Sequence, residues 1–258
     1  MPHSDSEDLH AVALYWDFEN IHASLCNEKE PGSYANKDNR FKPQEPLVDV
    51  QAVVDMAASF GPIAINRAYC NWQYFGRYRH LMLQNAVELL QLFPPGDNAK
   101  NGADIKLCLD AAEDIARFPH IGTVIIVGGD SDFMPVSHKI KAAGRTLIGV
   151  GLRKTTNKNW ASSCHRFRYY ESLAQAPSDA AAPPDLPADL LRRAVRLLGE
   201  QRGEEWVDQG AVWPLIKRLD PTFDLQEHGH SSFPAMVKSL GGLVEVHKGT
   251  NDQLIRLR

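Results

Sequence analysis

The chain has 258 residues, of which 43% are hydrophobic, and a formal net charge of -4 at pH 7. This length predicts one sizeable α/β core and a smaller second domain. No apolar run approaches the roughly 18 residues that a membrane helix needs, and the acidic, polar residues 1–9 do not resemble a secretory signal. The four cysteines form no C-x-x-C pair and have no histidine at zinc spacing, which predicts reduced thiols in a cytoplasmic protein.

Hydrophobic runs and helical spacing alternate along the first 150 residues. Strands alternating with helices predict a parallel sheet with helices on both faces. A polar loop is expected after the first strand, to about residue 46, and an aromatic loop at 69–78. The expected strands are 11–16, 63–68, 87–93, 123–127 and 146–150, and the expected helices are 48–60, 77–84, 103–118 and 133–143.

The composition changes near residue 174, where alanine, proline and serine dominate a segment that ends at residue 187. Such a composition is typical of a linker. We therefore expect one domain at 10–173, a linker at 174–187 and a small domain at 188–258. The small domain has short helical segments and a terminal pair of strands, which predicts a winged helix-turn-helix shape.

Acidic residues follow two of the predicted strands. Asp17 comes after the first, with Asn20 close behind, and Asp130 and Asp132 follow the strand 123–127 and a glycine pair. The carboxyl ends of strands are where open α/β sheets bind ligands. Two crowded carboxylates repel each other unless a cation or a shared proton intervenes. The pattern indicates a divalent-metal site, and metals at such sites usually act on phosphates.

Each acid also has a structural interpretation. Asp17 is equally well explained as a helix N-cap. Asp130 and Asp132 suit a helix start too, although Ser131 already offers a capping group, so one carboxylate is in surplus. Asp104 alone reads as an ordinary first-turn acid. Asp110 lies more than one turn further along that helix, and we expect it to support another ligand or to face solvent.

Basic residues are concentrated between residues 133 and 170, where eight lysines and arginines occur without any aspartate or glutamate. Aromatic residues are interleaved at Trp160, Phe167, Tyr169 and Tyr170, and phosphates need cations while bases need stacking surfaces. A solvated helix face is the commoner origin of such a charge run. The residues expected to contact RNA are Lys100, Lys106, Arg145, Arg153, Lys154 and Lys158.

Three blocks of the sequence together resemble a known family. The blocks Tyr15-Trp-Asp-Phe-Glu-Asn-Ile21, Asn101-Gly-Ala-Asp-Ile-Lys-Leu107 with Asp110, and Val127-Gly-Gly-Asp-Ser-Asp-Phe133 are similar to the signatures of NYN domains. NYN domains are PIN-like, metal-dependent ribonucleases with a Rossmann-like sheet. The resemblance covers residues 10–172 and implies Mg²⁺ or Mn²⁺ as cofactor. It implies catalytic and metal-binding roles for Asp17, Asp104, Asp130 and Asp132, with Asn20 in support.

The C-terminal segment is similar, more weakly, to OST-HTH (LOTUS) domains, which are RNA-associated winged helices. Trp206, Pro221-Thr-Phe-Asp224, Gly229, Phe233 and Leu240 carry this similarity. Residues 189–258 contain ten basic and ten acidic residues, so this domain is expected to recognise RNA shape, G-rich RNA or a protein partner. A homodimer is a further expectation.

The favoured function is a metal-dependent endoribonuclease in which water is the nucleophile and the C-terminal domain helps to choose the RNA. One alternative is a non-catalytic RNA-binding regulator that retains the fold and the acids. Another is a receiver-like or phosphatase-like domain with a phosphorylated aspartate. That alternative is weak because Lys106 lies on the wrong element for it.

Overall fold

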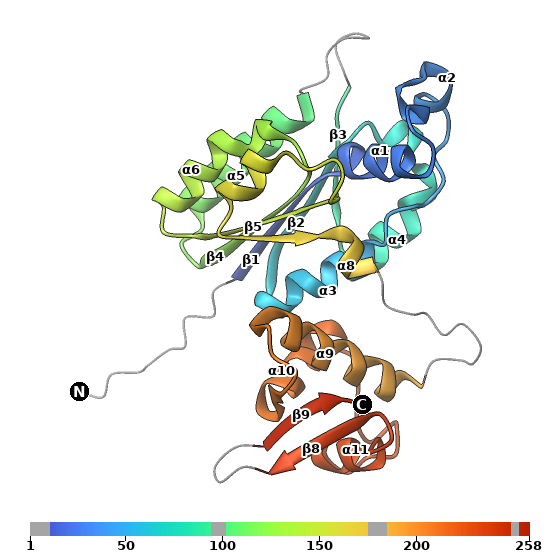
Figure 1. Ribbon diagram of the computed structural model, residues 1–258, viewed down its shortest axis with the longest axis vertical. Coiled ribbons are helices and arrows are strands. Elements are labelled where there is room, and N and C mark those ends of the chain that lie inside the picture. The colour runs from blue at the N-terminus through green and yellow to red at the C-terminus, as the bar shows by residue number, and fades with distance from the viewer. Residues whose placement is uncertain (1–10, 94–101, 175–184, 249–252) are drawn as a thin grey trace. The chain divides into compact units, whose positions relative to one another are not determined.

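The computed structural model describes residues 11–93, 102–174, 185–248 and 253–258. The chain divides into two compact units, Met1–Ala176 and Pro177–Arg258, which are both visible in Figure 1. Within the described residues, no helix is both long enough and apolar enough to cross a membrane.

The first unit is built on a six-stranded parallel sheet with the order β3-β2-β1-β4-β5-β6. All seven residues of β1 are buried, as expected for the centre of a parallel sheet whose two faces are both covered. The sequence predicted this α/β class correctly. The strands are β1 Ala11–Asp17, β2 Ile63–Cys70, β3 Glu88–Gln91, β4 Ile121–Val127, β5 Thr146–Gly151 and β6 Arg166–Tyr169.

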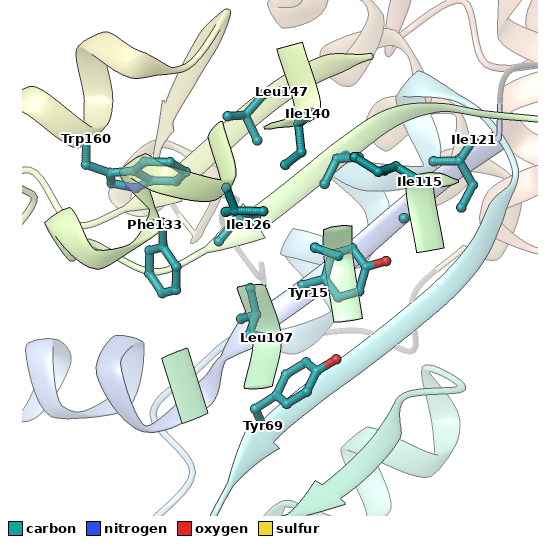
Figure 2. Close-up of a cluster of buried hydrophobic side chains, with 14 residues drawn as sticks. Tyr15, Tyr69, Leu107, Ile115, Ile121, Ile126, Phe133, Ile140, Leu147 and Trp160 are labelled. Atoms are coloured by element: carbon teal, nitrogen blue, oxygen red, sulfur yellow. The ribbon is translucent and has the colours of Figure 1, made fainter. Parts of the chain in front are cut away.

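Helices pack on both faces of this sheet (Figure 1). On one face lie α5 Gly102–Arg117 and α6 Met134–Ala142, whose apolar residues meet those of the central strands. Figure 2 shows this core, with Leu107 of α5 between the side chains of Tyr15 and Tyr69 and the ring of Phe133 beside Trp160. The helix α3 Val50–Phe60 also packs on β1, through its own apolar stripe. These layers hold the carboxyl ends of the strands at one edge.

The segment between β1 and α3 corrects the prediction of a polar loop. It contains the helices α1 Phe18–Lys29 and α2 Lys37–Arg40 and a 3₁₀ turn at Ser33–Ala35. The buried residues of α1 are few, Phe18, Ile21 and His22, and the rest of the helix is polar. So narrow an apolar face left no clear helical period in the sequence.

The expected aromatic loop holds two 3₁₀ turns, Trp72–Tyr74 and Gly76–Tyr78, followed by α4 Arg79–Gln84. Its rings pack on α1: the ring of Phe18 lies 5.6 Å from that of Phe75 and 4.8 Å from that of Tyr78. The sequence also failed to predict the edge strand β6 and its neighbours α7 Lys158–Ser163 and α8 Tyr170–Ala174. These are too short to show a period.

The second unit is helical with a small antiparallel sheet, in agreement with the winged-helix prediction. Its sheet has the order β7-β9-β8, with β7 Val207–Asp208, β8 Val244–Lys248 and β9 Gln253–Leu257. Among its described residues the helices are α9 Leu186–Arg202, α10 Gln209–Leu219 and α11 Phe233–Ser239. The core joins buried leucines of α9 to Val212, Ile216 and Ile255.

Candidate active site

The acidic residues meet at the carboxyl edge of β1 and β4, the two central strands. Trp16 is the register partner of Val127, so Asp17 at the end of β1 lies beside the Gly128–Asp130 loop that leaves β4. No side chain separates the two strand ends, because a Cβ atom on Gly128 would approach the ring of Phe133 to 2.6 Å and Cβ of Asp17 to 3.4 Å. The sheet therefore brings Asp17 and Asp130 to the same place.

Asp17 caps a helix and also touches another acid. Its Oδ1 accepts a hydrogen bond of 3.3 Å from the backbone N–H of Asn20, which makes it the N-cap of α1. The side chain is buried, and it shares a hydrogen bond with the Asp104 carboxyl. Burial, followed by the charge of Asp104, raises the pKa of the Asp17 carboxyl well above its usual range. Asp17 is therefore the N-cap that one interpretation predicted, and it also lies against a second acid.

Asp104 reaches this edge from the first turn of α5, which packs on β1. Its pKa is raised by burial, and the charges of Asp130 and Asp132 also act to raise it. The thiol of Cys108, one turn along the same helix, responds to the same acids. Burial raises its pKa to about 12, with Asp104, Asp132 and Asp17 adding to the effect. Four carboxylates thus share one electrostatic environment.

Asn20 connects the two halves of this cluster. Its Nδ2 donates a hydrogen bond of 3.2 Å to Oδ2 of Asp130, and its Oδ1 accepts one of 3.0 Å from the backbone N–H of Gly129. Both ends of the amide are used, so the side chain fixes the loop after β4 relative to α1. The position of Asn20 in the first turn of α1 supports the orienting role expected for it.

Asp130 precedes the short 3₁₀ turn Ser131–Phe133 that leads into α6, and Asp132 lies within that turn. Asp130 occupies the N-cap position of that turn, but its side chain makes no capping hydrogen bond. The carboxylate instead accepts from Asn20. The capping explanation therefore does not account for Asp130, which is free to serve a ligand.

The chemistry of these side chains suits a hard cation, because carboxylate oxygens are the ligands that Mg²⁺ and Mn²⁺ prefer. Among the described residues, no group of three or more His, Cys, Asp or Glu side chains is arranged to hold a metal ion. A cation that keeps several waters needs only one or two protein carboxylates. The buried pair Asp17 and Asp104 can supply those one or two carboxylates.

Two further acids of α5 have a different environment, which the sequence did not reveal. Asp110 is buried, accepts a hydrogen bond of 2.8 Å from the hydroxyl of Tyr69, and forms an ion pair with Lys106. It therefore does not face solvent. Asp114, which no sequence motif indicated, accepts a 2.8 Å hydrogen bond from the Tyr15 hydroxyl and forms an ion pair of 2.6 Å with Arg67.

The sequence did contain a signal for the partners of Asp110 and Asp114, namely one tyrosine in each of the strands β1 and β2. A buried phenol needs a hydrogen-bond partner, and aspartates four residues apart on the facing helix supply it.

The basic residues expected to contact RNA divide into several groups. Arg153, Lys154 and Lys158 follow β5 at the same edge as the acids. Arg145 immediately precedes β5 and so lies at the opposite, amino edge of the sheet. It is therefore too far from the acids to contact the same stretch of RNA. Lys106 is committed to Asp110. Lys100 lies outside the described residues.

Comparisons with known proteins agree with this geometry. The NYN domain model matches residues 11–171, and the OST-HTH/LOTUS domain model matches residues 184–256. NYN domains belong to the PIN-like nuclease superfamily, and OST-HTH/LOTUS domains bind RNA.

Single proteins give more limited matches. The chain is 32% identical over 104 residues to a Methanocaldococcus jannaschii protein named "Uncharacterized protein MJ0482", covering 40% of each chain. A crystal structure of VPA0982 from Vibrio parahaemolyticus, described as a protein of unknown function, aligns with a TM-score of 0.49 and 19% identity. That alignment covers 64% of this chain and 94% of the other. The domain match over residues 11–171 identifies the chain as a member of the NYN domain family.

Proposed function

We propose that this protein is a metal-dependent ribonuclease that hydrolyses RNA phosphodiesters at the carboxylate cluster of Asp17, Asp104, Asp130 and Asp132. One observation carries the proposal. Asp17 and Asp104 are buried together with raised pKa values, and the described neighbours of Asp104 that act on it include two more acids. Buried, crowded carboxylates lower the stability of the folded protein, and carboxyl groups with such raised pKa values are typical of functional sites.

In this proposal one or two carboxylates of the cluster Asp17, Asp104 and Asp130 would hold Mg²⁺ or Mn²⁺ together with water, and Asp132 contributes negative charge beside them. The bound cation would make water more acidic and neutralise charge on the scissile phosphate. Asn20 keeps Asp130 in place through its two hydrogen bonds. Burial raises the pKa values of Asp17 and Asp104 in the metal-free protein, so metal binding would displace protons that the pair holds.

The experiment is incubation of purified protein with 5′-labelled single-stranded and structured RNAs in Mn²⁺, in Mg²⁺ or in EDTA. We expect cleavage only with a divalent ion, and loss of cleavage in Asp130→Asn. A matched control is Glu113→Gln, since Glu113 is an exposed acid on α5. RNA binding without cleavage under every condition would instead make the protein a non-catalytic RNA-binding regulator.

The OST-HTH/LOTUS domain is proposed to select the RNA or a protein partner. Its charges balance, so it is expected to recognise structured or G-rich RNA by shape rather than by general attraction to phosphate. A protein truncated after residue 173 should still cleave a short unstructured RNA and should bind a preferred structured RNA less tightly, because linked modules raise effective concentration. Loss of all cleavage by a folded truncated protein would contradict this division of labour.

A further inference from the structure

The aromatic residues of the basic segment are not equally available to an RNA base. Trp160 is completely buried and donates a hydrogen bond of 2.9 Å to the carbonyl of Gly128. Tyr170 is also buried, and its hydroxyl accepts a bond of 2.7 Å from the backbone N–H of Asp49. Phe167 covers Gly149, where an added Cβ would lie 2.5 Å from its ring. These three rings pack in the protein core, so Tyr169 is the aromatic residue of this segment that remains available for contact with RNA.

Tyr169 lies in the same row of the sheet as the acidic site. Trp16, Val127, Val150 and Arg168 are successive register partners across β1, β4, β5 and β6. One residue further along each strand, this row runs from Asp17 through two glycines to Tyr169. Register partners in a parallel sheet point to the same face. Tyr169 is therefore on the Asp17 face, two strands or about 10 Å beyond the loop of Asp130.

Arg153 lies on the ring of Tyr169, with its guanidinium carbon 4.0 Å from the ring centroid. Its backbone N–H donates a hydrogen bond of 2.8 Å to Glu171, which anchors the main chain at this point. The loop that carries Arg153 is tied to the acidic loop, because the backbone N–H of Asn157 donates to the carbonyl of Gly129 at 2.8 Å. The two loops therefore keep a fixed spacing.

The charge of Arg153 is not matched by an acid in the described part of the chain, where no carboxylate pairs with its guanidinium. The next residue differs, since Lys154 forms an ion pair of 3.1 Å with Glu28 of α1. Arg153 is also exposed. A guanidinium with one face on a tyrosine and its charge unpaired can accept a base on its other face and attract the neighbouring phosphates.

We propose that Arg153, supported by Tyr169, is a stacking platform for an unpaired RNA base a few nucleotides from the scissile phosphate. This inference rests on the proposed function and deepens it: the substrate must be single-stranded on the β6 side of the cleaved bond. Base stacking is tolerant of sequence, so the platform selects for an unpaired nucleotide rather than for one particular base.

The test uses the Asp130→Asn protein, so that RNA stays intact, and single-stranded oligonucleotides that each carry 2-aminopurine at one position. Stacking quenches 2-aminopurine fluorescence, so quenching confined to one or two adjacent positions is expected on binding. Arg153→Lys keeps the charge but removes the planar surface. It should abolish that quenching and lower affinity on the order of 5- to 100-fold, with an unchanged salt slope.

Three further variants separate stacking from charge and from folding. Tyr169→Phe keeps the supporting ring and should retain the quenching, whereas Tyr169→Leu should lose it. Lys154→Gln, in the same loop, should reduce the salt slope and leave the quenching in place. Melting temperatures of all variants show that each is folded.

The outcomes distinguish this inference from the function on which it rests. RNA binding with the same local quenching in Arg153→Lys as in its parent would overturn the platform and leave the nuclease proposal intact. The platform is also overturned if quenching spreads evenly over all positions. Absence of RNA binding at every position would overturn both.

Discussion

Helix α5 carries three buried aspartates in two contrasting environments. Asp110 and Asp114 each accept a hydrogen bond from a tyrosine hydroxyl and each pair with a cation, Lys106 or Arg67. Asp104 is similarly buried, at 8% exposure against 8% and 6%, but it bonds to Asp17 and lies near Asp130 and Asp132. The three aspartates are therefore alike in residue type and in burial, and they differ only in the groups that their carboxylates contact.

This contrast shows how a structural acid is distinguished from a functional one. An acid with a donor and a cation is neutralised inside the protein and has no charge left for a ligand. An acid surrounded by acids lowers stability, and the cost is relieved only when a cation or a proton arrives. We therefore propose that the Asp104 end of α5 is the end that binds a ligand, whereas the Asp114 end fastens the helix to the sheet.

The largest expected effect is on RNA cleavage, which should depend on Asp104 but not on the ion-paired acids of α5. Asp104→Asn should reduce cleavage by at least about 100-fold, because loss of a metal-binding carboxylate removes several kcal/mol of transition-state stabilisation. The introduced amide can donate a hydrogen bond to Asp17, so the melting temperature in EDTA should be unchanged or raised. Initial rates on a labelled RNA measure the first effect and calorimetry the second. Cleavage at the parental rate would place Asp104 among the structural acids.

The next effect is on stability. Asp114→Asn breaks the ion pair with Arg67 and weakens the bond from Tyr15, which should destabilise the domain by about 2–4 kcal/mol. The cause is that the half-buried guanidinium of Arg67 keeps only the more exposed Glu88 as its partner. Urea unfolding in EDTA measures it. A destabilisation equal to that of Asp104→Asn would remove the contrast on which this account depends.

A smaller effect is expected at Tyr69. Tyr69→Phe removes the 2.8 Å hydrogen bond to Asp110 but leaves Lys106 in place. The loss should be about 1 kcal/mol, the usual net value of such a bond, with cleavage of saturating RNA changed little. A strong loss of cleavage with full stability would instead show that Asp110 participates in catalysis.

The smallest effect concerns pH. Burial raises the pKa of Asp17 in the folded protein, so its favourable contribution is complete below the unfolded pKa and is lost as pH rises through the folded value. In EDTA, Asp17→Asn should therefore be more stable than the parent at about pH 8 and equal to it near pH 4. Asparagine is also a good N-cap, so α1 should start normally. Thermal unfolding across pH tests this, and parallel curves would contradict it.

The sequence predicted those parts of the fold and site that depend on local pattern. The Val/Ile run of β4 and the acids that follow β1 and β4 identified the sheet class and placed Asp17 and Asp130 at one edge. The side-chain amide of Asn20 was correctly placed beside them. These predictions succeeded because a short stretch of consecutive residues is enough to show where a buried strand runs and where it ends.

What the sequence could not reveal depends on contacts between distant elements. The neutralisation of Asp114 requires that β1, β2 and α5 meet, since Tyr15 and Arg67 come from different strands. Arg145 is basic and near the acids in sequence, yet it sits at the amino edge because β5 carries the chain across the sheet after it. Helix α1 was missed because its buried face is so small.

The most direct test of the central claim is a calorimetric Mn²⁺ titration of the parent, Asp104→Asn and Glu113→Gln proteins, because metal binding must displace protons from carboxyls whose pKa values are raised. The account predicts that the parent and Glu113→Gln bind Mn²⁺ alike and release protons on binding, and that Asp104→Asn loses most of this binding. Binding of Mn²⁺ by Asp104→Asn with the affinity and proton release of the parent would contradict it.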